Sequence, residues 1–374
     1  MHTIQLIGSA EFSALKEEWN GLLSRSASDN VFLRWEWLHT WWQIFKQNRQ
    51  LLILSIQRDG KRVGLAPFYI EQSGKLGLRK LRFCSDELSP DYLDVIAERG
   101  EEAGVVRTLW DYLRANPLWD LIVWDHLRED SILLSAPVKS ADDTYKMRGA
   151  HTCPYIKITG SKDDYYEAHP DIQFRRKRKL LFNKHAVTHH VIKDEIELEQ
   201  HINTLFVLHE KRAEEKKIQT SLASAEIKHF HLELSRLFLR ENILNFQFLY
   251  HGNTAISALY AFNYKNKVYF FQSGMDPEWG KCSAGSVLIN LAVEQAFEGG
   301  LDEFDFLKGE ERYKTLWATA VRQELEVSLY NQTWRGRLWH TLLGLRATLG
   351  SVKHAVKDTL TWRRPEAARQ GSTA

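Results

Sequence analysis

One residue type suited to acid–base chemistry stands out in the last third of the chain. Asp305 lies between Phe304 and Phe306 in a short apolar segment, and the alternation of a strand would place the two rings on one face and the carboxylate on the other. A carboxylate near the C-terminal end of a strand lies where open α/β sheets bind ligands. We therefore take Asp305 as the first candidate for a general base, with pairing to Lys308 or Lys314 as the structural alternative.

Other side chains nearby are candidates for moving protons or holding charge. His209 lies in a predicted helix over residues 196–215. It is either a second candidate base or a histidine whose hydrogen bonds serve only the fold. Glu310 and Tyr313 are three residues apart, so a short helix would bring them to one side. Tyr313 would then protonate a leaving thiolate, and Lys314 would hold a phosphate or an acidic acceptor.

The segment that contains Asp305 has the order of a phosphate-binding unit. An aromatic strand over 268–271 is followed by a turn-rich loop over 276–285, a helix over 286–298 and a second strand over 302–307. Small residues let a diphosphate approach the backbone, and unpaired N–H groups at the start of a helix bind it. The residues expected to bind the cofactor that carries such a diphosphate are Ser273, Gly274, Gly280, Lys281, Ser283, Ala284, Gly285, Ser286 and Lys314. An ordinary crossover that binds nothing is the alternative.

Both halves of the chain repeat one order of elements, which indicates a structural duplication. In the first half the expected strands are 4–7, 51–57, 62–70, 78–84, 121–124 and 155–158, and the expected helices are 12–23, 35–45 and 101–114. In the second half the expected strands are 187–192, 244–250, 255–264, 268–271, 302–307 and 325–330, and the expected helices are 196–215, 225–240, 286–298 and 311–317. Strand 155–158 is expected to close the first sheet. The first half has no glycine loop before its crossover helix, so the second half is expected to be the working copy.

Composition limits the class of protein. At 374 residues, 44% of them hydrophobic, the chain is long enough for two domains. A net charge of +2 argues against a general nucleic-acid binder, and no DNA partner is expected. Three cysteines without CxxC spacing fit a reducing compartment and give no sign of a metal site. We recognise no signal peptide and no membrane-spanning stretch, and therefore expect a soluble, cytoplasmic protein.

Two basic segments stand apart from this balance. Residues 175–179 are five successive cations, which form either a solvated helix face or linker, or a site for the phosphates of a donor or for an acidic acceptor. Residues 331–374 hold eight Lys or Arg against two acidic residues. Apolar spacing makes residues 334–364 an amphipathic helix that packs on its own domain, or contacts a partner or an anionic membrane. Its apolar stripe consists of Leu338, Leu342, Leu345, Leu349, Val352 and Val356.

Several short segments resemble one family of enzymes. They are residues 35–38 (WEWL), 41–42 (WW), 66–68 (APF), 91–94 (DYLD), 208–212 (LHEKR), 273–276 (SGMD), 283–285 (SAG) and 304–310 (FDFLKGE), the last followed by Tyr313-Lys314. Together they resemble the GNAT-superfamily acetyltransferases named after the cellulose-biosynthesis protein CelD (BcsL), a family that is itself similar to the FemABX peptidyltransferases. The segment of the form DF-L-x-G-x-E-x-x-YK is the most specific part, and the resemblance spans nearly the whole chain.

The resemblance implies an α/β fold of mixed sheets with two tandem GNAT-like domains. A degenerate domain would cover 1–165, an acyltransferase domain 166–330, and a basic helical tail 331–374. It also implies transfer of an acyl group, typically acetyl, from acyl-CoA to an amine or hydroxyl on a sugar, polysaccharide or cell-envelope precursor, and contact with envelope-polysaccharide machinery. The superfamily's usual phosphate loop reads Q/R-x-x-G-x-G/A, whereas residues 281–286 place Ala284 at a glycine position. The expectation of acyl-CoA as the donor therefore rests on the resemblance more than on the loop.

Two other functions remain open. In a FemABX-like peptidyltransferase the donor would be aminoacyl-tRNA, and the cations of residues 175–179 would follow the RNA backbone. In a non-catalytic partner of an envelope-polysaccharide synthase, the basic tail would supply the docking surface.

Overall fold

The computed structural model describes residues 1–374 except 89, 136–143, 173, 218–223, 310 and 343–374. The first half contains helices α1 (Ser9–Ala14), α2 (Lys16–Ser24), α3 (Trp35–Phe45) and α4 (Glu102–Ala115), and strands β1 (His2–Ile7), β2 (Arg49–Arg58), β3 (Lys61–Ser73), β4 (Leu78–Phe83), β5 (Ile96–Ala97), β6 (Leu121–Arg128) and β7 (Thr144–Lys157). The second half contains helices α5 (Lys162–Ala168), α6 (Arg175–Lys179), α7 (Leu198–Lys216), α8 (Ala225–Arg240), α9 (Ala284–Glu298) and α10 (Arg312–Trp317), and strands β8 (Thr188–Val191), β9 (Leu244–His251), β10 (Thr254–Tyr264), β11 (Lys267–Met275), β12 (Glu303–Asp305) and β13 (Ala320–Tyr330).

The expected order of elements is present in both halves, with one local error. The helix expected over residues 12–23 is two helices, because α1 ends and α2 begins at Leu15, whose side chain is buried in the core. The strands expected over 51–57 and 62–70 are present as β2 and β3, which pair as a hairpin, and Asp59 and Gly60 at its turn both have the positive φ that a tight hairpin turn requires.

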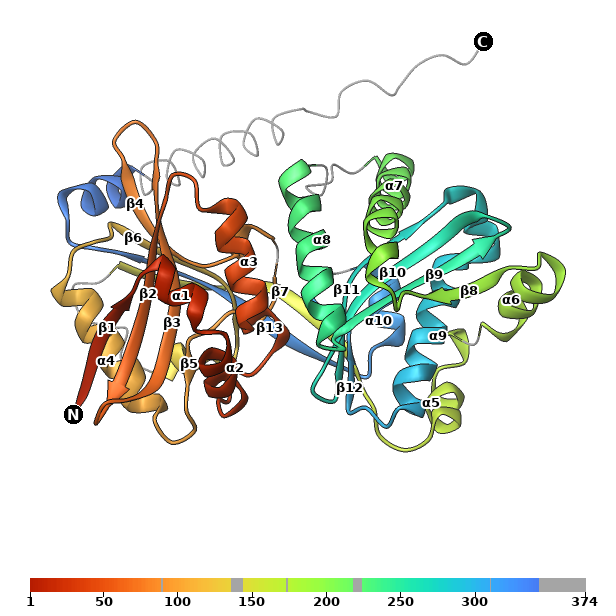
Figure 1. Cartoon of the computed structure of the whole chain (residues 1–374), viewed down its shortest axis with the longest axis horizontal. Coiled ribbons are helices and arrows are strands. Elements are labelled where there is room, and N and C mark those ends of the chain that lie inside the picture. Colours follow the sequence, from red (N-terminus) through yellow and green to blue (C-terminus); the bar gives the residue numbers. More distant parts are fainter. Residues whose placement is uncertain (89, 136–143, 173, 218–223, 310, 343–374) are drawn as a thin grey trace, which may run out of the picture.

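All the strands belong to one mixed sheet. Its order is β1-β2-β3-β4-β6-β13-β7-β12-β11-β10-β9-β8, and β5 pairs with β3. The pairs β4–β6 and β11–β12 are parallel, as the crossover helices α4 and α9 require, and the other neighbours are antiparallel. Figure 1 shows the two halves side by side, with β7 and β13 crossing between them.

The last strand of each half pairs with the other half. Residues 155–157 of β7 pair with β12 of the second half, so the expectation that this segment closes the first sheet is wrong. Residues 325–330 of β13 pair with β6 of the first half, and β7 and β13 also pair with each other. The 14 residues of β7 are long enough to reach both halves, whereas the sequence pattern marked only its end.

Two hydrophobic clusters lie on opposite faces of the second half's sheet. The helices α7 and α8 cover the face that also carries Tyr269 and Leu307, and this cluster continues into the first half. The helix α9 covers the other face, which carries Phe304 and Phe306. The alternation expected around Asp305 is therefore confirmed, and the carboxylate faces the junction between the halves.

Both halves contain a parallel pair of strands that diverges after a few residues, and the chain that follows the first strand of each pair takes a different course in the two halves. In the first half β4 and β6 pair at two positions, and the loop that follows β4 then occupies the opening, because Leu93 N–H donates to the His126 carbonyl of β6 at 2.9 Å. In the second half β11 and β12 pair at three positions, and the chain leaves β11 through the loop that leads into α9. The expectation that the second half is the working copy stays a prediction.

The described part of the tail packs against the first half. Residues 334–342 are helical, and Trp339 packs on Leu78, Leu121 and Tyr330. The apolar stripe from Leu345 to Val356 lies outside the described residues. In the part of the chain that the structure describes, we find no helix long and apolar enough to cross a membrane.

Candidate active site

The point where β11 and β12 diverge is the centre of the candidate site. Residues 267–269 of β11 pair with residues 303–305 of β12, after which β11 continues to Met275 paired with β10 only. The edge of β11 that faces the opening therefore presents backbone groups without a strand partner. Ser273 shows this directly, because its N–H donates to the Gln272 side-chain oxygen at 2.9 Å and its carbonyl accepts from His209.

The loop after β11 leads to an uncapped helix N-terminus. A short 3-10 helix over Pro277–Cys282 ends at Ser283, which has φ 57° and turns the chain into α9. Among the described residues, no group accepts a hydrogen bond from the N–H of Ala284 or Ser286, and the Ser283 side chain does not cap the helix. Unpaired N–H groups at the start of a helix, together with the helix dipole, are suited to binding an anion.

Neither loop glycine is needed by the fold itself. Gly280 and Gly285 do not adopt positive φ, and an added Cβ would come no closer than 3.9 Å to Met275 at Gly280 and 3.4 Å at Gly285. Gly274 differs, because an added Cβ would lie 2.7 Å from Leu208 Cβ, so glycine there lets α7 pack closely on β11. The side chains of residues 283–286, at the start of α9, are small.

The close contact of α7 with β11 places His209 beside Ser273. The distance from His209 Nδ1 to the Ser273 carbonyl is 3.3 Å, and because a carbonyl only accepts, Nδ1 carries the proton. Burial lowers the pKa of His209, although the Ser273 contact acts in the opposite direction, so the imidazole is neutral at pH 7. Arg212, one turn further along α7, donates to Ser273 Oγ at 3.2 Å.

Tyr313 joins the same group of residues, and Lys314 does not. The Arg212 guanidinium lies 5.8 Å from the centre of the Tyr313 ring, and burial raises the pKa of this phenol, which therefore keeps its proton. Lys314 is buried and donates to the Lys308 carbonyl at 2.5 Å, so it holds the turn between β12 and α10. Glu310 lies outside the described residues.

Asp305 lies deeper, at the junction between the halves, and is fully buried. Its carboxylate accepts hydrogen bonds from Arg322 Nη1, the Tyr92 hydroxyl and the Leu307 N–H, each at 2.8 Å. Arg322 also binds Glu303, at 2.7 and 2.8 Å. Burial raises the pKa of Asp305 to about 7, against the effect of Arg322. The role of Asp305 as the base stays a prediction, and these contacts favour the structural alternative, with Arg322 in place of the expected lysines.

Lys308, one of the two lysines expected to pair with Asp305, contacts the first half instead. Leu307 has φ 57°, which turns the chain after β12, and Lys308 forms an ion pair with Asp91 at 2.9 Å. Lys308 Nζ also lies 3.2 Å from His126 Nδ1. Tyr92 and His126 have positive φ as well, 61° and 65°. Such backbone strain in non-glycine residues gathers at functional sites, and here it surrounds the contact between the halves.

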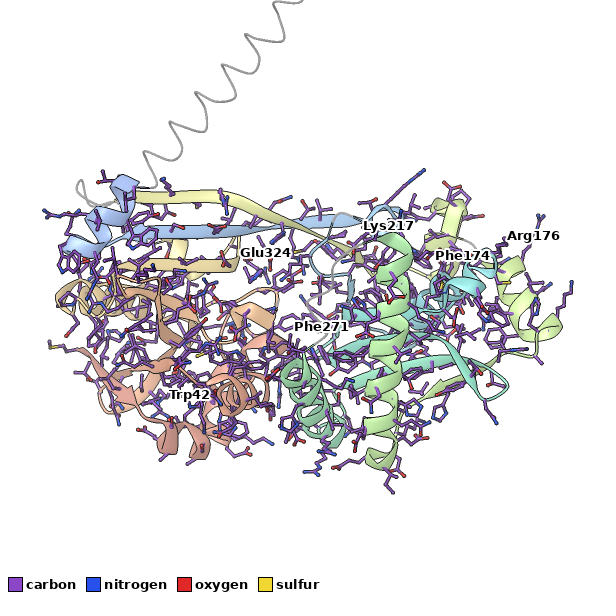
Figure 2. The ribbon with its side chains drawn as sticks, turned by 90° about the horizontal axis from the view of Figure 1, so that it is seen from above. Trp42, Phe174, Arg176, Lys217, Phe271 and Glu324 are labelled. Carbon is purple, nitrogen blue, oxygen red and sulfur yellow. The ribbon has the colours of Figure 1, made fainter. Side chains whose placement is uncertain are left out.

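Asp91, Cys153 and Glu324 bring three possible metal-ligand atoms within 4.8 Å of one another in this junction. The ammonium of Lys308 already supplies a positive charge beside Asp91. Burial raises the pKa of Glu324 to about 8 and lowers that of His126 to about 3. Figure 2 shows Glu324 on the strand that crosses between the halves and Phe271 at the centre of the molecule.

Sequence reasoning assigned no site role to several residues of both halves at this junction. Asp91 and Tyr92 belong to the DYLD segment that supported the family resemblance, which was the available signal for them. His126, Arg322 and Glu324 lie in ordinary strand patterns and had no such signal.

Comparison with known proteins defines the class. Residues 172–315 match the family model described as an acetyltransferase (GNAT) domain. The chain therefore contains a GNAT acetyltransferase domain in its second half, and it is an acyltransferase of this type, for which acyl-CoA is the implied co-substrate. No curated protein matches the chain.

Solved structures extend the likeness to most of the chain. A crystal structure of FemX superimposes with a TM-score of 0.61 at 10% identity, covering 87% of this chain and 96% of that one. A conserved protein of unknown function from Bacteroides thetaiotaomicron gives a TM-score of 0.54 at 10% identity, covering 88% and 100%. The C-terminal domain of a putative lysylphosphatidylglycerol synthetase from Agrobacterium fabrum gives 0.54 at 9% identity, covering 88% and 95%. At this level of identity the likeness shows the mixed α/β fold alone.

Proposed function

We propose that the protein transfers an acyl group, typically acetyl, from acyl-CoA to an amine or hydroxyl acceptor by direct attack. The observation that carries this proposal is the opening between β11 and β12, which ends at the unpaired N–H groups of α9. The donor's pyrophosphate would bind the Ala284 and Ser286 N–H groups. Its thioester would then extend along the unpaired edge of β11 towards Ser273.

The residues around Ser273 supply the groups that direct acyl transfer requires. The Ser273 N–H, which Gln272 covers in the free protein, would bind the thioester oxygen as negative charge develops on it. His209 would take the proton of the acceptor as the new C–N or C–O bond forms. Tyr313 would give its proton to the thiolate of coenzyme A as the C–S bond breaks.

The acceptor would reach this point from the junction, where the first half contributes residues. Phe271 on β11 lies 6.1 Å from the ring of Phe32 and 5.5 Å from that of Trp37, both in the first half. The resemblance to the CelD family supports a sugar or a polysaccharide or envelope precursor as the acceptor, with the division at residues 1–165, 166–330 and 331–374. A cytoplasmic location follows from the use of acyl-CoA and belongs to the same proposal.

Release of coenzyme A tests the proposal directly. The protein with acetyl-CoA should release free thiol in a saturable manner when an amine or hydroxyl acceptor, such as an amino sugar or a nucleotide sugar, is added. Hydrolysis without acceptor should be slower, because direct transfer needs the acceptor nucleophile. Thiol release that no acceptor accelerates would contradict the proposal.

An aminoacyl-tRNA donor is the second candidate, favoured by the fold likeness to FemX and by the cations of α6. It predicts transfer from aminoacyl-tRNA where acetyl-CoA gives none, with tRNA binding that weakens steeply with salt.

A docking role of the tail is the third candidate. Trp334, Leu338 and Leu342 are exposed along one helix face and would contact a synthase partner or an anionic membrane.

A further inference from the structure

A cavity of about 550 Å³ lies beside α9, on the outer side of the second half. One wall of the cavity is formed by α6 and the π-helix over Leu180–Lys184 that follows it. The facing wall includes Leu291 of α9. Its lining residues are Arg175, Arg176, Arg178, Lys179, Phe182, Asn183, His189 and Leu291. Figure 1 shows α6 at the outer edge beside α9, and Figure 2 shows Arg176 there.

The cavity combines unpaired cations with apolar walls. Arg175, Arg176 and Lys179 are exposed, and no described residue forms an ion pair or a hydrogen bond with their side chains. Arg178 is paired with Glu294 at 2.7 Å. Phe182 and the buried Leu291 provide apolar surface between these cations. Such a site suits a phosphate attached to a flat ring system, because guanidinium groups bind phosphate and also stack on aromatic rings.

Two contacts fix the cavity wall to the phosphate loop of the candidate active site. Lys177 Nζ donates to the Lys281 carbonyl at 2.6 Å, and the rings of His185 and Trp279 lie 5.4 Å apart, edge to face. Leu291 follows Ser286 by five residues, which is roughly 7.5 Å along the axis of α9. Along the axis of α9, the distance from the N–H groups proposed to bind the pyrophosphate to the start of the cavity is therefore about the length of one nucleoside.

We propose that this cavity binds the 3′-phosphorylated adenosine end of acyl-CoA. The inference rests on the proposed function, because it takes coenzyme A as the donor held at the loop between β11 and α9. In coenzyme A the 3′-phosphate is separated from the pyrophosphate by the ribose alone. With the pyrophosphate at Ser286, the adenine would lie against Phe182 and Leu291, and the 3′-phosphate would meet Arg175, Arg176 and Lys179.

Acetyl-CoA and acetyl-dephospho-CoA, which lacks only the 3′-phosphate, separate this inference from the proposed function. In calorimetric titrations at low salt the wild type should bind acetyl-CoA about tenfold or more tighter, as a phosphate that meets several cations requires. A triple variant, Arg175→Gln, Arg176→Gln and Lys179→Gln, should bind both compounds alike, at the affinity of the wild type for acetyl-dephospho-CoA. A control, Lys157→Gln with Lys193→Gln, neutralises two exposed lysines outside the cavity lining, one at the end of β7 and one just after β8, and should keep the preference.

Three outcomes would overturn the inference, and they are distinguishable. Equal affinity of the wild type for both compounds would remove the 3′-phosphate site while leaving coenzyme A as the donor. A triple variant that keeps the preference would move the site elsewhere. Absence of binding of either compound would remove both proposals, and if tRNA then bound the wild type but not the triple variant, the cavity would belong to an RNA backbone.

Discussion

Replacing Arg322 by alanine is expected to lower the free energy of unfolding by about 3–5 kcal/mol, the cost of leaving buried charges without their partner. The Arg322 guanidinium is the shared partner of Glu303 and Asp305, whose side chains are buried. It also stacks on the Tyr155 ring at 3.9 Å, so one side chain links β7, β12 and β13. Urea denaturation of the wild type and Arg322→Ala measures the difference.

Arg148→Ala is the matched control for Arg322→Ala. Arg148 pairs with Glu326 between the same two strands, β7 and β13, but its side chain is 73% exposed. Exposed pairs contribute about 1 kcal/mol or less, so this variant should unfold close to the wild type. Equal losses in the two variants would contradict the view that the buried carboxylates depend on Arg322.

Replacing His209 by alanine is expected to lower kcat by about 100-fold or more, the usual loss for a general base. The Kd for acetyl-CoA should change little, since the proposed donor contacts are made by the loop before α9. His229→Ala is the control, because His229 is an exposed histidine on the neighbouring helix α8. Wild-type turnover in His209→Ala would return the role of base to Asp305 or to water.

The pH dependence separates the two candidate bases. Burial lowers the pKa of His209 below its ordinary value of 6.5, and the base must be neutral to accept a proton, so kcat/KM should be constant above pH 6.5 and fall at lower pH. With Asp305 as the base, whose pKa burial raises to about 7, kcat/KM would already fall as the pH drops through 7. In that case Asp305→Asn would cut turnover by roughly 100-fold.

Local patterns predicted most of the elements, because each depends on neighbours in sequence. The helix α3, the strands β2 and β3 and the crossover from β11 through α9 to β12 were all predicted from spacing and residue type. The alternation around Asp305 was predicted for the same reason.

The junction could not be predicted, because its contacts join residues far apart in sequence. Tyr92 and Asp305 are 213 positions apart, and Lys308 and Asp91 are 217 apart. No periodicity in a single sequence reports which strands exchange partners, so the pairing of β13 with β6 was missed. The sequence segments around Asp91 and Lys308 were noticed as motifs, but their mutual contact follows from the exchanged strands.

The measurement that tests the central claim most directly is a calorimetric titration with acetyl-CoA of the wild type, Ser286→Glu and Ser286→Gln. The wild type should bind with micromolar affinity. Ser286→Glu should weaken binding by about 100-fold or more, because the new carboxylate would occupy the phosphate site and repel the pyrophosphate of acetyl-CoA. An acidic residue in the first turn of α9 stabilises the helix, so the variant should remain folded, and the neutral Ser286→Gln should bind nearly as the wild type. Absence of binding in the wild type, or equal binding in all three proteins, would contradict a coenzyme A site at the loop between β11 and α9.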